Sequence, residues 1–185
     1  MIVWIDGTYG VGKTSIAYKV ENVFSEAEVL ESDVYWTEIF KKIIDETPKG
    51  CIPNFGGCLP QNNLRFIEEF KAIIEQKEKT ERKIVVIDMT LATNCCRDRL
   101  ISYFRDKNIN MLHFIIEADE NEIRERINND DKRSNKTLAL GELKQNLLFY
   151  GNNYIDAIRI NTIDKTINDA VDEIVQIISR YKENM

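Results

Sequence analysis

The sequence predicts an α/β fold in which helices cover both faces of an open parallel sheet. Short apolar runs typical of buried strands alternate with helical segments along the 185 residues, which favours parallel strands joined by helical crossovers. A glycine-rich loop joins the first strand to the first helix. The length and the mixed composition, 43% hydrophobic and 30% charged, indicate one globular domain over residues 1–185.

The glycine-rich loop carries the most specific motif of the chain. After the apolar run Ile2–Ile5, residues 7–14 read GTYGVGKT and match the phosphate-binding pattern Gly-x-x-x-x-Gly-Lys-[Ser/Thr]. Glycines allow successive N–H groups to turn toward an anion, and the N-terminus of the following helix also favours negative charge. Lys13 would add a positive charge for the outer phosphates, and the Thr14 hydroxyl would hold Mg²⁺. We therefore predict that ATP is bound by Gly7, Tyr9, Gly10, Val11, Gly12, Lys13, Thr14 and Ser15.

The remaining elements follow from hydrophobic periodicity and from helix start signals. Further strands are predicted at residues 28–31, 83–88, 111–116 and 157–160. Helices are predicted at residues 15–20, 34–45, from Leu59-Pro60 to the charged run 75–79, at about 95–105, after Asp119, at about 138–149 and from about Thr166. Asp119 and Glu122 have the spacing of a capping box for the helix that follows them.

Two irregular segments are expected to serve the site. The glycine- and proline-rich segment 48–57 predicts a long loop within an acceptor-binding insert at about 34–80. Trp36, Phe40 and Phe55 flank it, either as core side chains or as the lining of an acceptor pocket. The polar segment 128–136 predicts a surface loop or lid within a region of about 119–140.

Two acids at predicted strand ends are candidate chemical groups. Asp88 ends the strand at 83–88, where its carboxylate would support Mg²⁺ beside the phosphate loop; alternatively it caps a turn. Asp33 follows the strand at 28–31 and would orient or deprotonate an acceptor hydroxyl. Its alternative role is that of a helix N-cap, and Glu31 is the other candidate acid.

Three arginines of the lid region are candidates for phosphate contacts. A mobile lid can bring positive charge to the transferred phosphate as it closes and can expel water. We predict Arg126 and Arg133 as catalytic residues, together with Lys13 and Asp33, and Arg124 as a nucleotide contact. The alternative is a solvated helix with local ion pairs such as Glu122–Arg126.

The segment after the fifth predicted strand, residues 161–164, borders the expected position of a nucleotide base. We predict a base contact at Thr162, and the alternative is a plain connection to the last helix. Guanine specificity is disfavoured because the chain has no Asn-Lys-x-Asp signature. His113 lies within an apolar strand, which favours a structural over a catalytic side chain.

Charge and hydropathy argue against several classes of function. The net charge of −6 disfavours broad nucleic-acid binding. Because no apolar run is long enough to span a bilayer and no signal-peptide pattern is visible, we expect a cytoplasmic protein. Cys51, Cys58, Cys95 and Cys96 would be free thiols there, and their spacing is not that of a zinc site.

On these motifs the chain resembles small P-loop kinases of the nucleoside-monophosphate and shikimate kinase type. The resemblance covers nearly the whole chain and implies a parallel five-stranded sheet with strand order 2-3-1-4-5. The chain is similar to bacterial tunicamycin-resistance ATP-binding proteins at residues 1–5 and 7–14, at residues 87–90 and at the pair His113-Phe114. That similarity implies ATP binding, with either a small-molecule kinase activity or drug sequestration.

Departures from the kinase pattern bear on the acceptor. Nucleoside-monophosphate kinases hold the acceptor's phosphate with an arginine shortly after the third strand, whereas residues 88–91 read DMTL and no arginine precedes Arg65. The expected acceptor is therefore a nucleoside, sugar or antibiotic with a free hydroxyl. Asp130 occupies the place of a second lid arginine, which favours Arg133 over Arg126. We predict an ATP- and Mg²⁺-dependent kinase, monomeric or homodimeric; ligand sequestration without transfer and nucleoside-monophosphate kinase activity are the alternatives.

Overall fold

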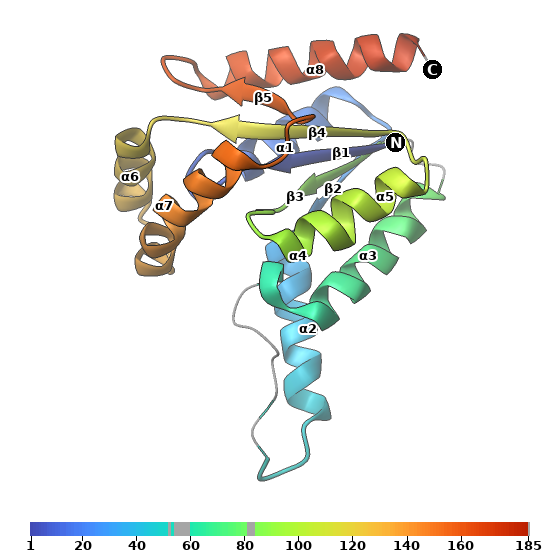
Figure 1. Ribbon diagram of the computed structural model, residues 1–185, viewed down its shortest axis with the longest axis vertical. Coiled ribbons are helices and arrows are strands. Elements are labelled where there is room, and N and C mark those ends of the chain that lie inside the picture. The colour runs from blue at the N-terminus through green and yellow to red at the C-terminus, as the bar shows by residue number, and fades with distance from the viewer. Residues whose placement is uncertain (52, 54–59, 81–83, 185) are drawn as a thin grey trace.

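A central parallel sheet organises the protein, as its computed structural model shows (Figure 1). The structure describes residues 1–51, 53, 60–80 and 84–184. The five strands lie in the order β2-β3-β1-β4-β5 and each neighbouring pair is parallel, which confirms the predicted fold class and strand order. The strands are β1 (Ile2–Asp6), β2 (Ala27–Glu31), β3 (Ile84–Asp88), β4 (Met111–Glu117) and β5 (Ile158–Asn161).

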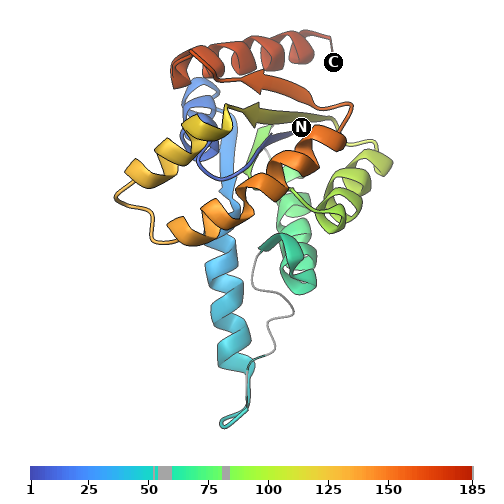
Figure 2. The ribbon, with the colours of Figure 1, turned by 60° about the vertical axis from the view of Figure 1, so that its left-hand side comes forward.

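Helices cover both faces of the sheet. One face carries α1 (Lys13–Val23) and α8 (Ile167–Glu183). The other face carries α2 (Ser32–Glu46), α3 (Leu64–Glu78) and a continuous helical segment made of α4 (Asn94–Cys96), the π-helical turn η2 (Arg97–Ile101) and α5 (Ser102–Asp106). The pair α6 (Glu120–Asn129) and α7 (Lys136–Asn152) lies at the carboxyl ends of the strands (Figure 2).

The apolar run of β1 explains the two cores. Successive side chains of a strand point to opposite faces of the sheet. Val3 and Ile5 therefore pack against the face covered by α1 and α8, whereas Ile2 and Trp4 pack against the face covered by α2 and α3. Because both faces are covered, every residue of β1 is buried, and the strand reads as a continuous rather than an alternating apolar run.

Helices α1 and α2 begin at Lys13 and Ser32, each two residues before its predicted start, and three further differences concern α3 and the lid region. The helix expected from Leu59-Pro60 begins instead at Leu64, because Pro60–Asn62 form a 3-10 turn (η1) and the Asn63 side chain caps α3 by accepting a 2.8 Å hydrogen bond from the Phe66 N–H. Leu59 itself lies outside the described residues.

The other two differences concern the lid region. Asp119 caps α6 through the Asn121 N–H, but Glu122 pairs with Arg126 rather than completing the expected capping box. Helix α7 begins at Lys136, two residues before its predicted start, so the lid loop is shortened to residues 130–135. No helix in the described part of the chain has the length and apolar character that crossing a membrane requires.

The predicted insert corresponds to α2, η1 and α3, and α2 projects away from the body of the sheet (Figures 1 and 2). Trp36 packs against Phe40 and Phe66, with ring centroids 5.3 and 5.6 Å away, so it belongs to the edge of a core. Phe55 and Cys58 lie outside the described residues. Cys51, Cys95 and Cys96 are free thiols.

Candidate functional site

The phosphate loop joins β1 to α1 at the carboxyl edge of the sheet, where open parallel sheets bind ligands. Gly7 and Gly10 have φ angles of 139° and 81°, and both approach neighbouring atoms too closely for a side chain. A Cβ atom at Gly7 would lie 2.6 Å from the carbonyl oxygen of Ile116 in β4, and one at Gly10 would lie 2.7 Å from Cγ1 of Ile127 in α6. The loop is thus packed between the central strands and the first lid helix.

Lys13 and Thr14 open helix α1, directly after its N-cap residue Gly12. The Lys13 side chain is buried against the loop, and its Nζ donates a 3.0 Å hydrogen bond to the Thr8 carbonyl oxygen. Its Nζ also lies 5.8 Å from the centroid of the Tyr9 ring. The Thr14 hydroxyl donates a 2.5 Å hydrogen bond to Oδ2 of Asp88. These contacts hold the phosphate loop, Lys13, Thr14 and Asp88 close together.

Asp88 ends β3, next to Ile5 of β1 in the strand register. Burial raises the pKa of its carboxyl above the usual value, and the positive charge of Lys13 opposes this effect. A desolvated carboxylate bonded to a hydroxyl is a good match for Mg²⁺, which prefers oxygen ligands and retains several waters. No group of three or more His, Cys, Asp or Glu side chains suited to a metal occurs among the described residues. Thr14 and Asp88 would therefore hold Mg²⁺ only together with phosphate and water oxygens.

Asp33 lies across this edge, in the first turn of α2. Its neighbour Glu31 is the N-cap residue of that helix, so the alternative role of Asp33 as an N-cap is wrong. The Asp33 side chain is exposed and borders a cavity between the phosphate loop, the ends of β2 and β3, and the lid loop. The described residues that line this acceptor-side cavity are Tyr9, Lys13, Thr14, Ser32, Asp33, Pro60, Asp88, Met89, Thr90 and Arg133.

A second cavity lies on the other side of the phosphate loop. The described residues that line this phosphate-side cavity are Gly10, Gly12, Lys13, Thr14, Ser15, Arg126, Asp130 and Arg133. Lys13, Thr14 and Arg133 line both cavities, so they lie where the two meet. Trp36 and Phe40 are not among the described lining residues of either cavity.

The lid arginines are each paired with a carboxylate one helical turn away or across the lid loop. Arg124 bonds Glu120 at 2.7 Å and lines neither of the two cavities, and Arg126 pairs with Glu122, as the alternative of local ion pairs predicts.

Arg133 is the lid arginine that lines both cavities. Its Nε lies 3.4 Å from Oδ2 of Asp130, and one of its Nη atoms donates to Oδ1 of Asn135 at 3.2 Å. The Nε atom is buried and makes no hydrogen bond to any residue that the structure describes. Arg133 therefore retains unused hydrogen-bonding capacity beside the two cavities.

The predicted base contact at Thr162 is buried. Its hydroxyl and its N–H both bond the Glu117 carbonyl oxygen, at 2.9 and 2.8 Å. The neighbouring Asn161 and Ile163 instead line a third cavity, which Val11 and the α7 residue Leu147 also border. The Thr162 side chain is thus committed to joining β4 and β5, and a base contact there stays a prediction.

Sequence reasoning missed a group of buried polar residues behind the phosphate loop. Asp6, the last residue of β1, accepts hydrogen bonds from the Gly7 N–H at 2.6 Å and from the Tyr150 hydroxyl at 2.5 Å. Nε2 of His113 lies 2.9 Å from its other oxygen. The sequence feature that could have indicated Asp6 is its position directly before Gly7, the first glycine of the phosphate loop. Tyr150 and Asn146 gave none, because both occur in an ordinary helical pattern far along the chain.

Comparisons with known proteins agree with this geometry. Residues 2–145, more than half of the chain, match the AAA domain family. The fold is similar to that of a tunicamycin resistance protein from Deinococcus radiodurans, with a TM-score of 0.71, 20% identity and coverage of 96% of this chain and 94% of that one. No curated protein matches the chain.

Two kinases share the fold at lower identity. A sugar kinase from Janibacter sp. HTCC2649 has a TM-score of 0.69 and 14% identity, covering 96% of this chain and 94% of that one. Thymidylate kinase from Candida albicans has a TM-score of 0.61 and 15% identity, covering 100% and 93%. These likenesses confirm the predicted small P-loop kinase fold, and the chain belongs to the AAA domain family.

Proposed function

We propose that this protein is an ATP- and Mg²⁺-dependent kinase that transfers the γ-phosphate of ATP to a hydroxyl group of a small molecule. The observation that carries the proposal is the meeting of two cavities at Lys13, Thr14 and Arg133. One cavity adjoins the amino end of α1, which suits a polyphosphate, and the other holds the exposed acid Asp33. Phosphoryl transfer requires such a junction, because donor and acceptor oxygens must lie in line on either side of one phosphorus.

We assign each residue of the site a role that follows from its charge. Lys13 would move its Nζ from the Thr8 carbonyl to the outer phosphates, and Thr14 with Asp88 would hold Mg²⁺, whose charge offsets that of the phosphate oxygens. Asp33 would orient the acceptor hydroxyl and accept its proton. Arg133 would stabilise negative charge on the transferred group, and closure of the lid would exclude water.

The acceptor is proposed to lack a phosphate group. Among the described lining residues of the acceptor-side cavity, the cations are Lys13 and Arg133, and both are assigned to the donor. Arg65 of the insert is bound to Glu46 and Glu69 instead. A nucleoside, a sugar or an antibiotic such as tunicamycin fits this arrangement, and the sugar kinase and tunicamycin resistance folds are consistent with it.

Two alternatives are retained. Sequestration of a ligand without transfer is favoured by the fold similarity to the tunicamycin resistance protein, and nucleoside-monophosphate kinase activity by the similarity to thymidylate kinase. An acceptor panel separates them: protein, ATP and Mg²⁺ are incubated with nucleosides, sugars, tunicamycin or nucleoside monophosphates. ADP formation is followed by chromatography, and the acceptor by mass spectrometry.

Formation of ADP in proportion to an acceptor that gains one phosphoryl group is the expected result. Asp33→Asn serves as the control, because it should remove transfer but not ATP binding. Tight acceptor binding with no product would favour sequestration, and turnover confined to the monophosphates would favour the third function.

A further inference from the structure

A buried polar cluster connects the phosphate loop to the lid. It consists of Asp6 at the end of β1, His113 in β4, the Leu91 backbone and Tyr150 in α7. Asp6 is fully buried, and three donors converge on its Oδ1: the Gly7 N–H at 2.6 Å, the Leu91 N–H at 2.9 Å and the Tyr150 hydroxyl at 2.5 Å. A buried carboxylate needs hydrogen-bond donors to offset the cost of its desolvation. Asp6 therefore holds these three donors in fixed positions around its Oδ1 atom.

The bond to Gly7 reaches the phosphate loop directly. Gly7 is the first residue of the loop, and its φ angle of 139° lies in a region that glycine reaches readily. Asp6 therefore fixes the direction in which the chain leaves β1. The Thr90 hydroxyl donates a 3.1 Å hydrogen bond to the Gly7 carbonyl oxygen and so holds the next peptide unit, which joins Gly7 to Thr8.

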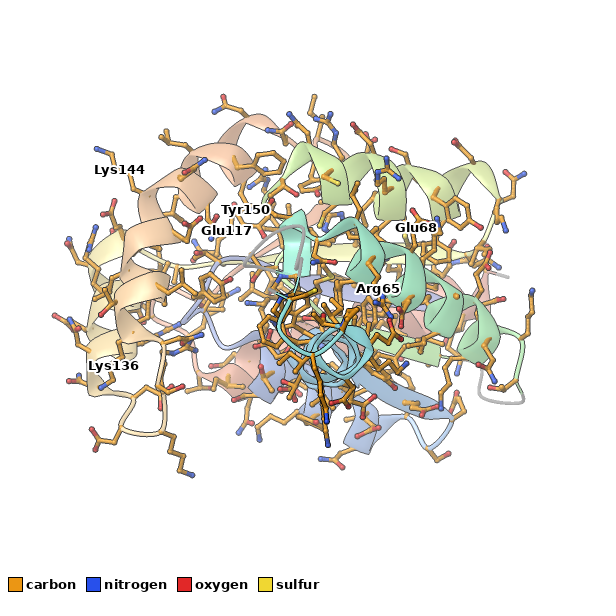
Figure 3. The ribbon with its side chains drawn as sticks, turned by 90° about the horizontal axis from the view of Figure 1, so that it is seen from below. Arg65, Glu68, Glu117, Lys136, Lys144 and Tyr150 are labelled. Atoms are coloured by element: carbon orange, nitrogen blue, oxygen red, sulfur yellow. The ribbon has the colours of Figure 1, made fainter. Side chains whose placement is uncertain are left out.

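Tyr150 supplies the connection to α7. Its hydroxyl donates to Asp6 and accepts a 3.1 Å hydrogen bond from the Leu91 N–H, so it bridges the loops that follow β1 and β3. Burial raises the pKa of Tyr150 well above its usual value, with the nearby Asp6 charge acting in the same direction, so the donor proton is retained. Figure 3 shows Tyr150 toward the centre of the molecule, whereas Lys136 and Lys144 of the same helix lie at its periphery.

A second contact lies one helical turn earlier. Nδ2 of Asn146 donates a 3.3 Å hydrogen bond to the Thr8 hydroxyl, and the Thr8 carbonyl oxygen accepts the hydrogen bond from Lys13. Helix α7 therefore holds the phosphate loop at two points, at Asn146 and Tyr150. The same helix starts at Lys136, three residues after Arg133, so its amino end carries the lid loop.

We propose that Tyr150 is a positioning residue that, through Asp6, sets the conformation of the phosphate loop and couples its occupancy to the position of the lid. A helix of 17 residues transmits displacement along its axis as a rigid element. Ordering of the loop around a polyphosphate therefore steadies α7 and the lid loop, and the linkage is reciprocal. This inference rests on nucleotide binding in the proposed function.

Tyr154 provides a matched control. It is a second buried tyrosine, adjacent to this cluster, and its hydroxyl donates a 2.7 Å hydrogen bond to the Leu91 carbonyl oxygen. Its ring contacts that of His113, with centroids 4.7 Å apart, but no hydrogen bond joins it to Asp6 or to the phosphate loop. Tyr150→Phe and Tyr154→Phe each remove one buried hydroxyl, so both should lower stability, but only the first should disturb the loop.

The test measures three quantities in full-length wild type, Tyr150→Phe and Tyr154→Phe. They are the thermal midpoint without ligand, the Kd of ATP with Mg²⁺ by calorimetry, and ATP-induced hydrogen-exchange protection of the lid loop and the first part of α7, residues 130–146. We expect Tyr150→Phe to raise the Kd by about tenfold, the scale of one buried hydrogen bond, and to abolish the protection. Tyr154→Phe should keep the Kd within about twofold of wild type and retain the protection.

Equal Kd values for the two variants, or unchanged lid protection in Tyr150→Phe, would overturn the inference while leaving nucleotide binding intact. Absence of ATP binding to the wild type would overturn the proposed function and this inference with it. If Tyr150→Phe does not fold, Asn146→Ala takes its place. That variant should raise the Kd and weaken lid protection, and wild-type values for both would also contradict the coupling.

Discussion

At the scale of single residues, the environment of Asp88 has a consequence for stability. Burial raises the pKa of this carboxyl in the folded protein, whereas an unfolded aspartate has a pKa of about 3.9. The contribution of Asp88 to stability is therefore fully present below about pH 3.9 and is lost as the pH rises through the raised pKa of the folded state. Above that raised pKa the protein holds a desolvated carboxylate, whose negative charge Mg²⁺ would compensate.

The substitution Asp88→Asn removes the free-energy cost of ionising a buried carboxyl group. We expect the nucleotide-free variant to gain stability relative to wild type as the pH rises from about 4 to 7, because its side chain does not ionise. Thermal unfolding of both proteins across this range, without Mg²⁺, measures the difference. Stability curves that stay parallel would mean that Asp88 does not titrate there. The same variant should lose the dependence of ATP affinity on Mg²⁺.

Asp33 is expected to serve transfer and not nucleotide binding. Its side chain is exposed in the acceptor-side cavity and is not among the described lining residues of the phosphate-side cavity. Asp33→Asn should lower phosphoryl transfer by at least about a hundredfold, which is typical for a lost acid–base group, with little change in ATP affinity. Turnover and the Kd of ATP are the two measurements. A variant with wild-type turnover would remove Asp33 from the mechanism.

At the scale of elements, the sequence predicts the parts that depend on local pattern. Strand β3 reads as an apolar run ending in Asp88, and the loop motif directly follows the apolar run of β1, so both were predicted at the right place. Helix starts were less predictable. Residues 60–62 form a 3-10 turn before α3, because the Asn63 side chain can cap the helix by a hydrogen bond, whereas Pro60, three residues earlier, has no side-chain acceptor.

The Asp6 cluster could not be predicted because it joins residues that are far apart in the chain. Asp6 and Tyr150 are separated by 144 positions, and only the packing of α7 at the carboxyl ends of the strands brings them together. The two-cavity arrangement has the same origin. The sequence indicated a lid near Arg133, but its place between the cavities depends on the path of the loop from α6 to α7.

The lid loop contains an acid, Asp130, that would compete with a bound phosphate for Arg133. Asp130 lines the phosphate-side cavity and lies 3.4 Å from the Arg133 guanidinium. Asp130→Asn should release Arg133 and remove repulsion, so the Kd of ATP is expected to fall by about two- to fivefold, the range of a surface ion pair. Calorimetric titration measures it. Glu125→Gln, which changes an exposed acid on α6 that lines neither cavity, is the matched control and should have no effect.

At the scale of the whole molecule, helix α8 contributes to a core, and none of its described residues lines the acceptor-side or the phosphate-side cavity. Helix α8 packs through Ile174 into the core shared with α1, far along the chain from the acceptor-side cavity. Ile174→Ala should destabilise the protein by about 2–5 kcal/mol, as expected for a fully buried aliphatic side chain. Denaturant unfolding measures this loss. ATP affinity of the folded variant should match wild type, and a large change would show that α8 also supports the site.

The site is assembled from segments that are far apart in the chain. Its central proposed property is that the phosphate loop with Lys13 binds the polyphosphate of ATP. The most direct measurement is ³¹P NMR of ATP and Mg²⁺ titrated with wild type and with Lys13→Ala. We expect the β- and γ-phosphate resonances to shift or broaden with wild type, and much less with the variant at the same concentration. Resonances that remain those of free ATP in the presence of excess wild-type protein would contradict the account.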